Sequence, residues 1–332
     1  MIGKNGSVHY TQGSSACFLN NESLVQEAAN EIRDHDIVVV VVGDTGDKDP
    51  QCQTCGEGKD RTSLTLSGDQ SKLVIAILDA AEKRQNVSVV IVLIHGRPIT
   101  FENVQSLDSS TVLNHSALTS IISAGRPGPF GSRAIVDLLV GKSYQFTGKL
   151  TRTWPANAGQ VVSASAPWFQ FPLRGGGISD LYAFNEAQAP LFPFAHGIIP
   201  GTNFTFSDLE IDFFSKEKSL ILKISVCVSN QGNRGGSALV AVFYSPPFVS
   251  GVLRYSRRLV KFTRVYVNPG KSIIVKDLVV NIERDLTRWD EYTHDFLLDE
   301  GKYGIHVGDC VVTGVLPRSD VACSQVSGSF TL

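Results

Sequence analysis

The chain lacks a strong charge of either sign and has no long apolar run. Its 332 residues include 30 Lys and Arg against 32 Asp and Glu, a formal net charge of −2. Such a balance offers no basic field to nucleic acid or to an anionic membrane surface. Apolar runs such as residues 37–42 have strand length and fall far short of the ~18 residues that span a bilayer. We therefore expect no nucleic-acid partner and no membrane partner.

Three patterns that would bind a cofactor or a metal are also missing. The run Gly43-Asp44-Thr45-Gly46 lacks the Gly-x-Gly-x-x-Gly spacing of a dinucleotide site. The run Gly141-Lys142-Ser143 lacks the upstream glycine of a phosphate-binding loop, because position 136 is Val. Cys52 and Cys55 have the spacing of half a zinc site, but no second pair follows at the right distance. We expect no cofactor and no metal, with this cysteine pair forming either a local disulfide or two free thiols.

Cysteines and glycosylation sequons favour a secretory context. The first residues, 1–6, are polar and do not resemble a secretory signal. Asn-x-Ser/Thr sequons outnumber the roughly one or two that chance would give. Six cysteines are compatible with an oxidising compartment, where Cys310 and Cys323 could close a terminal loop. We expect the back part of a longer precursor that is secreted or delivered to a lysosome or vacuole. The sequons begin at Asn5, Asn21, Asn86, Asn114 and Asn203.

The first half of the chain alternates predicted helices and strands. The β-branched run at residues 37–42 is typical of a strand that is covered on both faces. Strand–helix–strand alternation at this spacing predicts a mainly parallel sheet with helices on both faces. We assign residues 1–175 to this α/β-sandwich domain. Helices are predicted from Ser23, Ser67 and Ser132, and strands at residues 37–42, 87–94 and 118–124.

The last third of the chain is predicted to be all-β. Residues 220–228 alternate apolar and polar side chains with a period of two. Further short strands separated by Gly, Pro and Asn turns predict a β-sandwich over residues 209–332. Residues 176–208, which have no sustained period, are assigned as a linker.

The stretch Gly56-Glu57-Gly58-Lys59-Asp60-Arg61 is the strongest candidate for chemistry. It lies on a loop that leaves the carboxyl end of a predicted strand, where α/β proteins place functional groups. Glycines on both sides of Glu57 would let the loop bend over an active site. Taken alone, however, a solvated glutamate in such a loop usually has no catalytic role.

Segments in the same order across the chain resemble the last two domains of glycoside hydrolase family 3. They extend from about residue 8 to about residue 310, and their order is far more specific than any one of them. The resemblance implies an α/β-sandwich domain followed by a fibronectin type III-like domain. The matching segments include the Glu57 loop, His95-Gly96-Arg97-Pro98, Thr153-Trp154-Pro155, Trp289-Asp290 and Glu300-Gly301-Lys302-Tyr303.

The same resemblance implies a retaining β-glycosidase that acts on β-glucosides or β-xylosides. Glu57 would be the acid/base, protonating the leaving oxygen and later deprotonating water. The nucleophilic aspartate belongs, in this family, to an N-terminal (β/α)8 barrel that does not fit within this chain. The implied partners are a carbohydrate substrate and the missing barrel domain, and the chain alone is expected to be inactive. The alternative is a non-catalytic carbohydrate-binding or interaction module.

Three further residues are candidates near the substrate. Asp60 and Arg61 are expected to shape the Glu57 loop through an ion pair rather than to touch sugar. His95 follows a strand end and could line a cleft, although a structural, hydrogen-bonded histidine is the more ordinary interpretation.

Tryptophan is the remaining residue type with an affinity for sugars. Trp154, Trp168 and Trp289 could each stack on a sugar ring. Packing in a core or between domains is the favoured role for all three.

Overall fold

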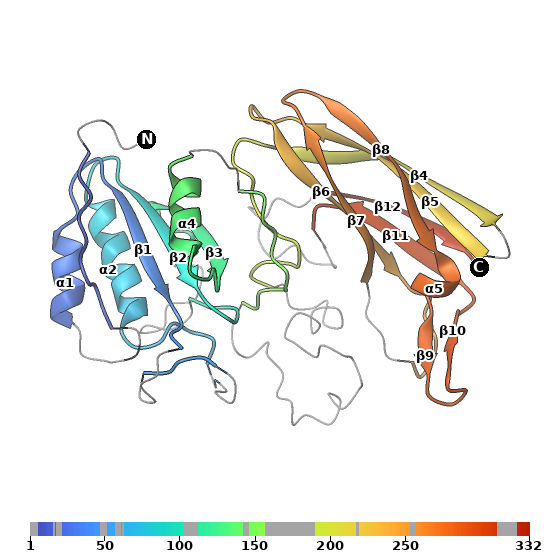
Figure 1. Ribbon diagram of the computed structural model, residues 1–332, viewed down its shortest axis with the longest axis horizontal. Coiled ribbons are helices and arrows are strands. Elements are labelled where there is room, and N and C mark those ends of the chain that lie inside the picture. The colour runs from blue at the N-terminus through green and yellow to red at the C-terminus, as the bar shows by residue number, and fades with distance from the viewer. Residues whose placement is uncertain are drawn as a thin grey trace. The chain divides into compact units, whose positions relative to one another are not determined.

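The computed structural model divides the chain into two compact units, which are described separately (Figure 1). The first unit is Met1–Tyr144 with Pro155–Val161, and the second is Gln145–Trp154 with Val162–Leu332. The structure describes residues 6–15, 17, 22–46, 52–56, 61, 63–101, 112–141, 146–156, 190–216, 219–252, 257–310 and 324–332. Glu57, Asp60, Trp168 and Cys323 lie outside these ranges. The predicted linker is described only from residue 190 onward, so the predicted domain boundaries stay a prediction.

The first unit is built on a three-stranded parallel sheet with the order β1-β2-β3. Helix α2 connects β1 to β2, and a parallel sheet with helices confirms the predicted α/β architecture. The strands are β1 (Ile37–Gly43), β2 (Ser88–Ile94) and β3 (Leu118–Gly125). The helices are α1 (Glu22–Asn30), α2 (Gln70–Glu82) and α4 (Gly131–Leu139).

The core of the first unit lies between α2 and the central strand β2. The apolar residues of β2 are almost fully buried, as a strand with neighbours on both sides requires. Helix α2 turns an apolar stripe toward this sheet, and α1 packs against α2. The stripe consists of Leu73, Val74, Ile77, Leu78 and Ala81.

The first strand differs from the prediction. Residues 37–42 were expected to be covered on both faces, but Ile37 is 70% and Val41 is 62% exposed, whereas Val40 and Val42 are buried. Side chains alternate between the two faces of a strand, so one face of β1 packs inward and the other meets solvent. β1 is also an edge strand of the sheet formed by the described residues.

The predicted helix starts are each one to three residues from the observed ones. Helix α1 begins at Glu22, so Ser23 is inside the helix and cannot be its N-cap. Helix α2 begins at Gln70, three residues after Ser67, and its N-cap Asp69 makes no side-chain capping bond. The helix expected from Ser132 begins at Gly131. Tertiary contacts, described below for Gln70, set the start of α2 more strongly than a cap does.

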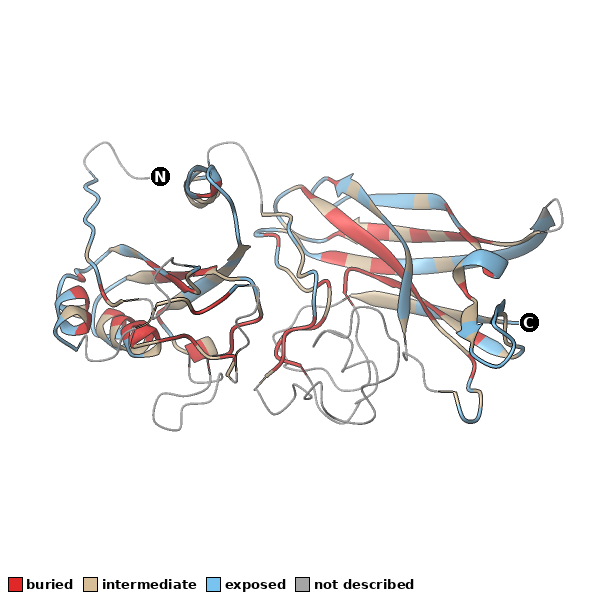
Figure 2. Ribbon diagram, turned by 60° about the horizontal axis from the view of Figure 1, so that its bottom comes forward, coloured by how far each residue is buried: buried red, intermediate tan, exposed pale blue. Residues whose placement is uncertain are grey.

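The second unit is a β-sandwich of antiparallel sheets, as predicted. A four-stranded sheet has the order β12-β11-β6-β7, and a three-stranded sheet has the order β4-β5-β8. Buried positions alternate with more exposed ones along β5 and β11, whereas β6 is buried over most of its length (Figure 2). The strands are β4 (Phe204–Lys216), β5 (Ser219–Asn230), β6 (Gly236–Ser245), β7 (Arg258–Val267), β8 (Ser272–Asn281), β11 (Lys302–Gly308) and β12 (Gln325–Thr331).

The short elements of the second unit follow β8. They are α5 (Ile282–Asp285) and a hairpin formed by β9 (Arg288–Asp290) and β10 (Asp295–Leu297). No helix within the described ranges is long and apolar enough to cross a membrane.

Trp154 belongs to the packing of the second unit. Its backbone pairs with Phe192, and its side chain is only 5% exposed. Nearby, Lys149 Nζ donates to the Gly197 carbonyl at 2.7 Å and lies 3.4 Å from Asp309 Oδ2. The packing role expected for Trp154 is therefore confirmed.

Candidate functional site

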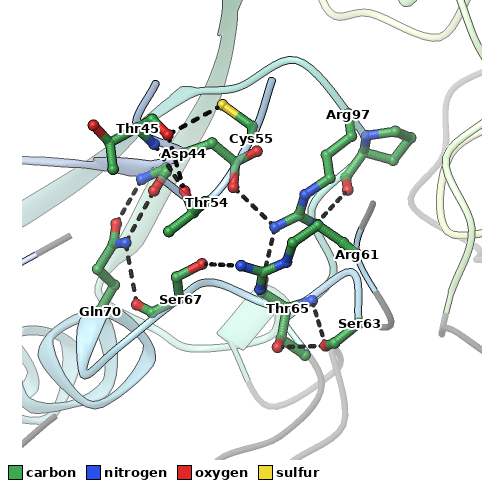
Figure 3. Close-up of polar contacts among 12 residues, drawn as sticks. Asp44, Thr45, Thr54, Cys55, Arg61, Ser63, Thr65, Ser67, Gln70 and Arg97 are labelled. Carbon is green, nitrogen blue, oxygen red and sulfur yellow. Dashed lines mark hydrogen bonds and ion pairs between the residues drawn. The ribbon is translucent and has the colours of Figure 1, made fainter. Parts of the chain in front are cut away.

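The candidate site lies at the carboxyl edge of the parallel sheet. Strands β1, β2 and β3 end at this edge, where α/β folds gather their functional loops. Figure 3 shows the polar side chains that follow β1 and β2, together with those that begin α2. Glu57 and Asp60 lie outside the described residues, but Cys55, Gly56 and Arg61 on either side of them are described. The contacts that the structure describes are therefore those at the base of the Glu57 loop.

The loop starts from a strand end that is fixed by Gln70. The Gln70 Oε1 accepts from the Gly43 N–H at 2.6 Å, and its Nε2 donates to the Gly43 carbonyl at 2.9 Å. Gly43 has φ +149°, and a Cβ at this position would overlap the Ile94 carbonyl oxygen. Only glycine fits at this position. The two bonds to Gln70 hold the last residue of β1 against the first residue of α2.

The next residue, Asp44, forms an ion pair with Arg97 from the loop after β2. Arg97 Nη2 lies 2.9 Å from Asp44 Oδ1 and also donates to the Thr65 carbonyl at 3.1 Å. The Asp44 side chain is 1% exposed and that of Arg97 is 15% exposed. Burial lowers the pKa of Arg97, while the Asp44 carboxylate opposes this shift and the Arg61 charge adds to it. The pair joins the ends of β1 and β2 in a poorly hydrated setting.

The base of the loop closes where Thr45 meets Thr54. The Thr54 N–H and the Cys55 N–H both donate to the Thr45 carbonyl, at 3.0 and 3.2 Å. In return, the Thr45 N–H donates to Thr54 Oγ1 at 2.9 Å. Gly56, the residue before Glu57, has φ +151°, which side-chain-bearing residues rarely adopt. The chain therefore enters Glu57 from a fixed base through a glycine-specific turn.

On the far side of Glu57, Arg61 returns the chain to the body of the unit. Its Nη1 donates to Ser67 Oγ at 2.9 Å, just before α2 begins. The Glu57 loop is thus held on both sides, by Thr45 and Cys55 before it and by Arg61 after it (Figure 3). The loop-shaping role expected of Arg61 stays a prediction, because the expected ion pair with Asp60 lies outside the described residues.

The cysteines pair differently from the prediction of a local Cys52–Cys55 disulfide or two free thiols. Cys52 is bonded to Cys17, with a Cα–Cα distance of 5.2 Å. Cys55 is a free, buried thiol that donates to the Thr45 carbonyl and accepts from Arg126 Nη2 at 3.0 Å. The backbone bonds of Cys55 turn its sulfur toward Arg126, which leaves Cys52 to pair with a partner 35 residues away.

The terminal cysteine pair is described only in part. Cys310 is disulfide-bonded, while Cys323 lies outside the described residues. The predicted closure of a terminal loop by these two cysteines therefore stays a prediction.

His95 lies at the same sheet edge and is hydrogen bonded on both its backbone and its ring. Its N–H donates to the Gly125 carbonyl at 2.9 Å, and its Nε2 lies 2.9 Å from Ser123 Oγ. Burial lowers the pKa of His95, which favours the neutral ring. These contacts support the structural interpretation of His95, and no described contact joins it to Arg61.

Sequence reasoning missed Asp44, Arg97 and Gln70 as parts of the site. Asp44 and Arg97 did appear in motifs, as the residue after a strand and as part of a matching segment, but nothing in either motif shows that they pair. Among the described residues, no group of three or more His, Cys, Asp or Glu is arranged to hold a metal.

The two units together define a class of protein: an α/β domain with a fixed loop at its sheet edge, followed by a fibronectin type III-like β-sandwich. The glycosyl hydrolase family 3 C-terminal domain matches residues 5–199, and a fibronectin type III-like domain matches residues 238–310. The chain belongs to glycosyl hydrolase family 3, which confirms the resemblance seen in its motifs.

Curated relatives carry glycosidase names. A β-xylosidase from Formosa agariphila is 28% identical over 271 residues, which cover 82% of this chain and 34% of the relative. Thermostable β-glucosidase B from Acetivibrio thermocellus is 26% identical over 297 residues, covering 87% of this chain and 35% of the relative. A periplasmic β-glucosidase from Salmonella typhimurium is 26% identical, with 86% and 34% covered. The chain spans about a third of the length of these relatives.

Solved structures show the same fold. A β-glucosidase from Kluyveromyces marxianus in complex with glucose superposes with a TM-score of 0.70 at 24% identity, over 95% of this chain and 34% of that one. A β-glucosidase from Streptomyces venezuelae in complex with D-glucose gives 0.66 at 25% identity, over 93% of this chain and 35% of that one.

Proposed function

We propose that this chain is the part of a retaining β-glycosidase that carries the acid/base, Glu57. The observation that supports this most is the fixing of the Glu57 loop on both sides, by Thr45 with Cys55 and by Arg61 with Ser67. A catalytic carboxyl must be held in a defined position, and such a pair of attachments restricts how far the loop can move. The names of the relatives give the substrate class, β-glucosides or β-xylosides.

The proposed reaction needs a second carboxyl from another domain of the same protein. In a retaining glycosidase the nucleophile and the acid/base are about 5–5.5 Å apart, and the first forms a glycosyl-enzyme intermediate. Glu57 protonates the departing oxygen as the glycosidic bond breaks, then deprotonates the water that releases the sugar. The barrel domain supplies the nucleophile in this proposal, and the chain alone does not hydrolyse glycosides.

We also propose a secreted or lysosomal/vacuolar glycoprotein. Three of the five sequon asparagines, Asn86, Asn114 and Asn203, are among the described residues, and all three are exposed. The Cys17–Cys52 disulfide fits an oxidising compartment, and the Salmonella relative is named periplasmic.

Replacement of Glu57 in the complete protein tests the catalytic role. We expect Glu57→Ala to lower kcat on an unactivated β-glucoside or β-xyloside by about 10²- to 10⁴-fold, with partial rescue by azide on an activated aryl glycoside. The matched control is Glu31→Ala, which removes an exposed carboxyl from the same unit and leaves turnover unchanged. Normal turnover of Glu57→Ala would replace this proposal with the alternative, a non-catalytic carbohydrate-binding or interaction module.

A further inference from the structure

The β9–β10 hairpin carries a pair of exposed aromatic rings that the proposed reaction does not use. Trp289 and Phe296 are directly opposite each other in the antiparallel register. Their ring centroids are 5.3 Å apart, and the ring planes meet at 71°. Trp289 is 50% exposed and Phe296 is 64% exposed. Figure 1 shows the hairpin extending beyond the long strands of the second unit.

The tryptophan stands at the centre of a small aromatic group. The His294 ring also meets it edge-on, with centroids 6.5 Å apart and an interplanar angle of 64°. Two rings at steep angles to Trp289 form a corner with it, in which a flat ligand can lie on one ring with its edge against another. We call Trp289, His294 and Phe296 the aromatic corner.

Charged side chains on the opposite face of the hairpin hold it in place. Side chains alternate along a strand, so Arg288 and Asp290 point away from the face that carries Trp289. Arg288 Nη1 lies 2.7 Å from Asp290 Oδ1, and its Nε lies 3.1 Å from Asp299 Oδ2, beyond the hairpin. Asp290 Oδ2 also accepts from the Thr293 N–H and hydroxyl, both at 2.9 Å. The turn and its attachment to the sandwich are therefore ordered without any contact from the aromatic corner.

We propose that the aromatic corner is a non-catalytic binding site for β-linked glucan or xylan chains. The axial C–H groups of a pyranose ring are slightly positive and apolar, and they stack on the negative face of an aromatic ring. The exposed acidic side chain of Glu291, in the turn between the two strands, provides acceptors for the hydroxyl groups at the rim of the sugar. Stacking below and hydrogen bonding at the edge are the two contacts that a sugar ring requires.

The surroundings of the corner fit a sugar better than a protein partner. Glutamate and aspartate are depleted at the centres of protein interfaces, where their desolvation is costly. Here Glu291 lies in the turn that joins the two ring-bearing strands, and it is exposed. A polyhydroxylated ligand keeps such carboxylates hydrogen bonded, whereas an apolar protein surface would strip them of water.

Stereochemistry makes the proposal selective. In β-linked glucose and xylose every ring hydroxyl is equatorial, so both ring faces present only C–H groups. Mannose has an axial 2-hydroxyl and galactose an axial 4-hydroxyl, each of which interrupts one apolar face. The corner should therefore prefer glucan and xylan chains to mannan and galactan chains.

Affinity electrophoresis of the 332-residue chain tests the site. We expect gels that contain soluble β-glucan or xylan to retard the chain, and galactomannan gels to retard it less. Trp289→Ala should weaken this retention by about tenfold, Phe296→Ala should weaken it less, and Trp289→Phe should restore part of it. The matched control is Phe262→Ala, which removes a 65% exposed ring from β7 of the same unit and leaves retention unchanged. Thermal melts verify that each variant is folded.

Several outcomes would overturn the site. They are no retardation in either gel, equal retention of Trp289→Ala and the wild type, and equal losses for Trp289→Ala and Phe262→Ala. A Trp289→Ala change that destabilises the complete protein while leaving sugar retention intact would make the corner a protein contact instead. Glu57→Ala should not alter retention, so the failure of this site and the failure of the proposed hydrolysis are separate results.

Discussion

Asp44 and Arg97, which follow neighbouring strands, form an ion pair of 2.9 Å at the base of the loop that carries Glu57. Both side chains are largely buried, so neither charge has much water to replace its partner. The pair links the ends of β1 and β2 at the edge where the site is built. Both the stability of the first unit and the geometry of the candidate site therefore depend on this ion pair.

Loss of one partner should be costly. We expect Asp44→Asn to lower the free energy of unfolding by about 3 kcal/mol, because the Arg97 charge stays buried without a carboxylate. The matched control is Asp137→Asn, which breaks the Arg133–Asp137 pair on α4, where Arg133 is 81% exposed, and should cost at most about 0.5 kcal/mol. Urea denaturation measures both variants, and equal effects would show that the Asp44–Arg97 pair is not effectively buried.

Gly43 should tolerate no side chain. We expect Gly43→Ala to destabilise the first unit by at least about 2 kcal/mol, since its Cβ would overlap the Ile94 carbonyl at a positive φ. Gly46→Ala is the control, because a Cβ there meets nothing within 4 Å. Thermal and urea unfolding of the two variants decide the matter, and a neutral Gly43→Ala would mean that the strand end shifts without cost.

The disulfide should join Cys17 to Cys52, so that Cys55 is alkylated once the unreduced chain is denatured. Peptide mapping without reduction tests this directly, and a Cys52–Cys55 linkage would contradict it. Cys52→Ser should lower the free energy of unfolding by about 3 to 4 kcal/mol, because the bond closes a loop of 35 residues. Cys227→Ser, which removes a free thiol from the second unit, should have little effect.

His306 should make the second unit sensitive to acid. Its ring nitrogens lie 2.9 Å from Ser245 Oγ and 2.8 Å from Ser327 Oγ. Burial first, and the Arg257 charge second, lower the pKa of His306 from 6.5 to about 4. The unfolded chain therefore gains a proton before the folded one does, so stability is full above pH 6.5 and falls as the pH drops toward 4.

A variant isolates this contribution from the other titrating groups. We expect His306→Gln, which keeps a side chain able to bond the serines, to flatten the decline between pH 6.5 and 4 in urea unfolding. An unchanged slope in the variant would show that other groups cause the acid sensitivity. His9→Gln, at an exposed position, serves as the control and should leave the slope as it is.

The sequence predicts what depends on local pattern and misses what depends on distant partners. Periodicity located the strands and the buried stripe of α2, because burial on one face leaves a repeating trace in the chain. The β-branched run of β1 led to a wrong prediction, namely that both faces of the strand are covered. The sequence does not show whether another element packs on Ile37 and Val41. Motif order identified the family, because each family segment keeps its place along the chain.

Contacts between separate segments lie beyond such patterns. Cys52 has a nearer cysteine at Cys55, and spacing alone favours that pair, yet the backbone bonds of Cys55 direct its sulfur elsewhere. The bonds from Gln70 to Gly43 span 27 residues and have no repeat that could reveal them. These contacts become predictable only when the sheet has already placed its strand ends together.

The attachments on both sides of the Glu57 loop determine where its sequence and length can be altered. Because Cys55 and Arg61 each bond to the body of the first unit, the segment between them has fixed ends. Substitution or lengthening of that segment should change the loop while the sheet below keeps its geometry. Transplants from relatives should therefore be made between these two ends, with Cys55, Arg61 and their partners left in place.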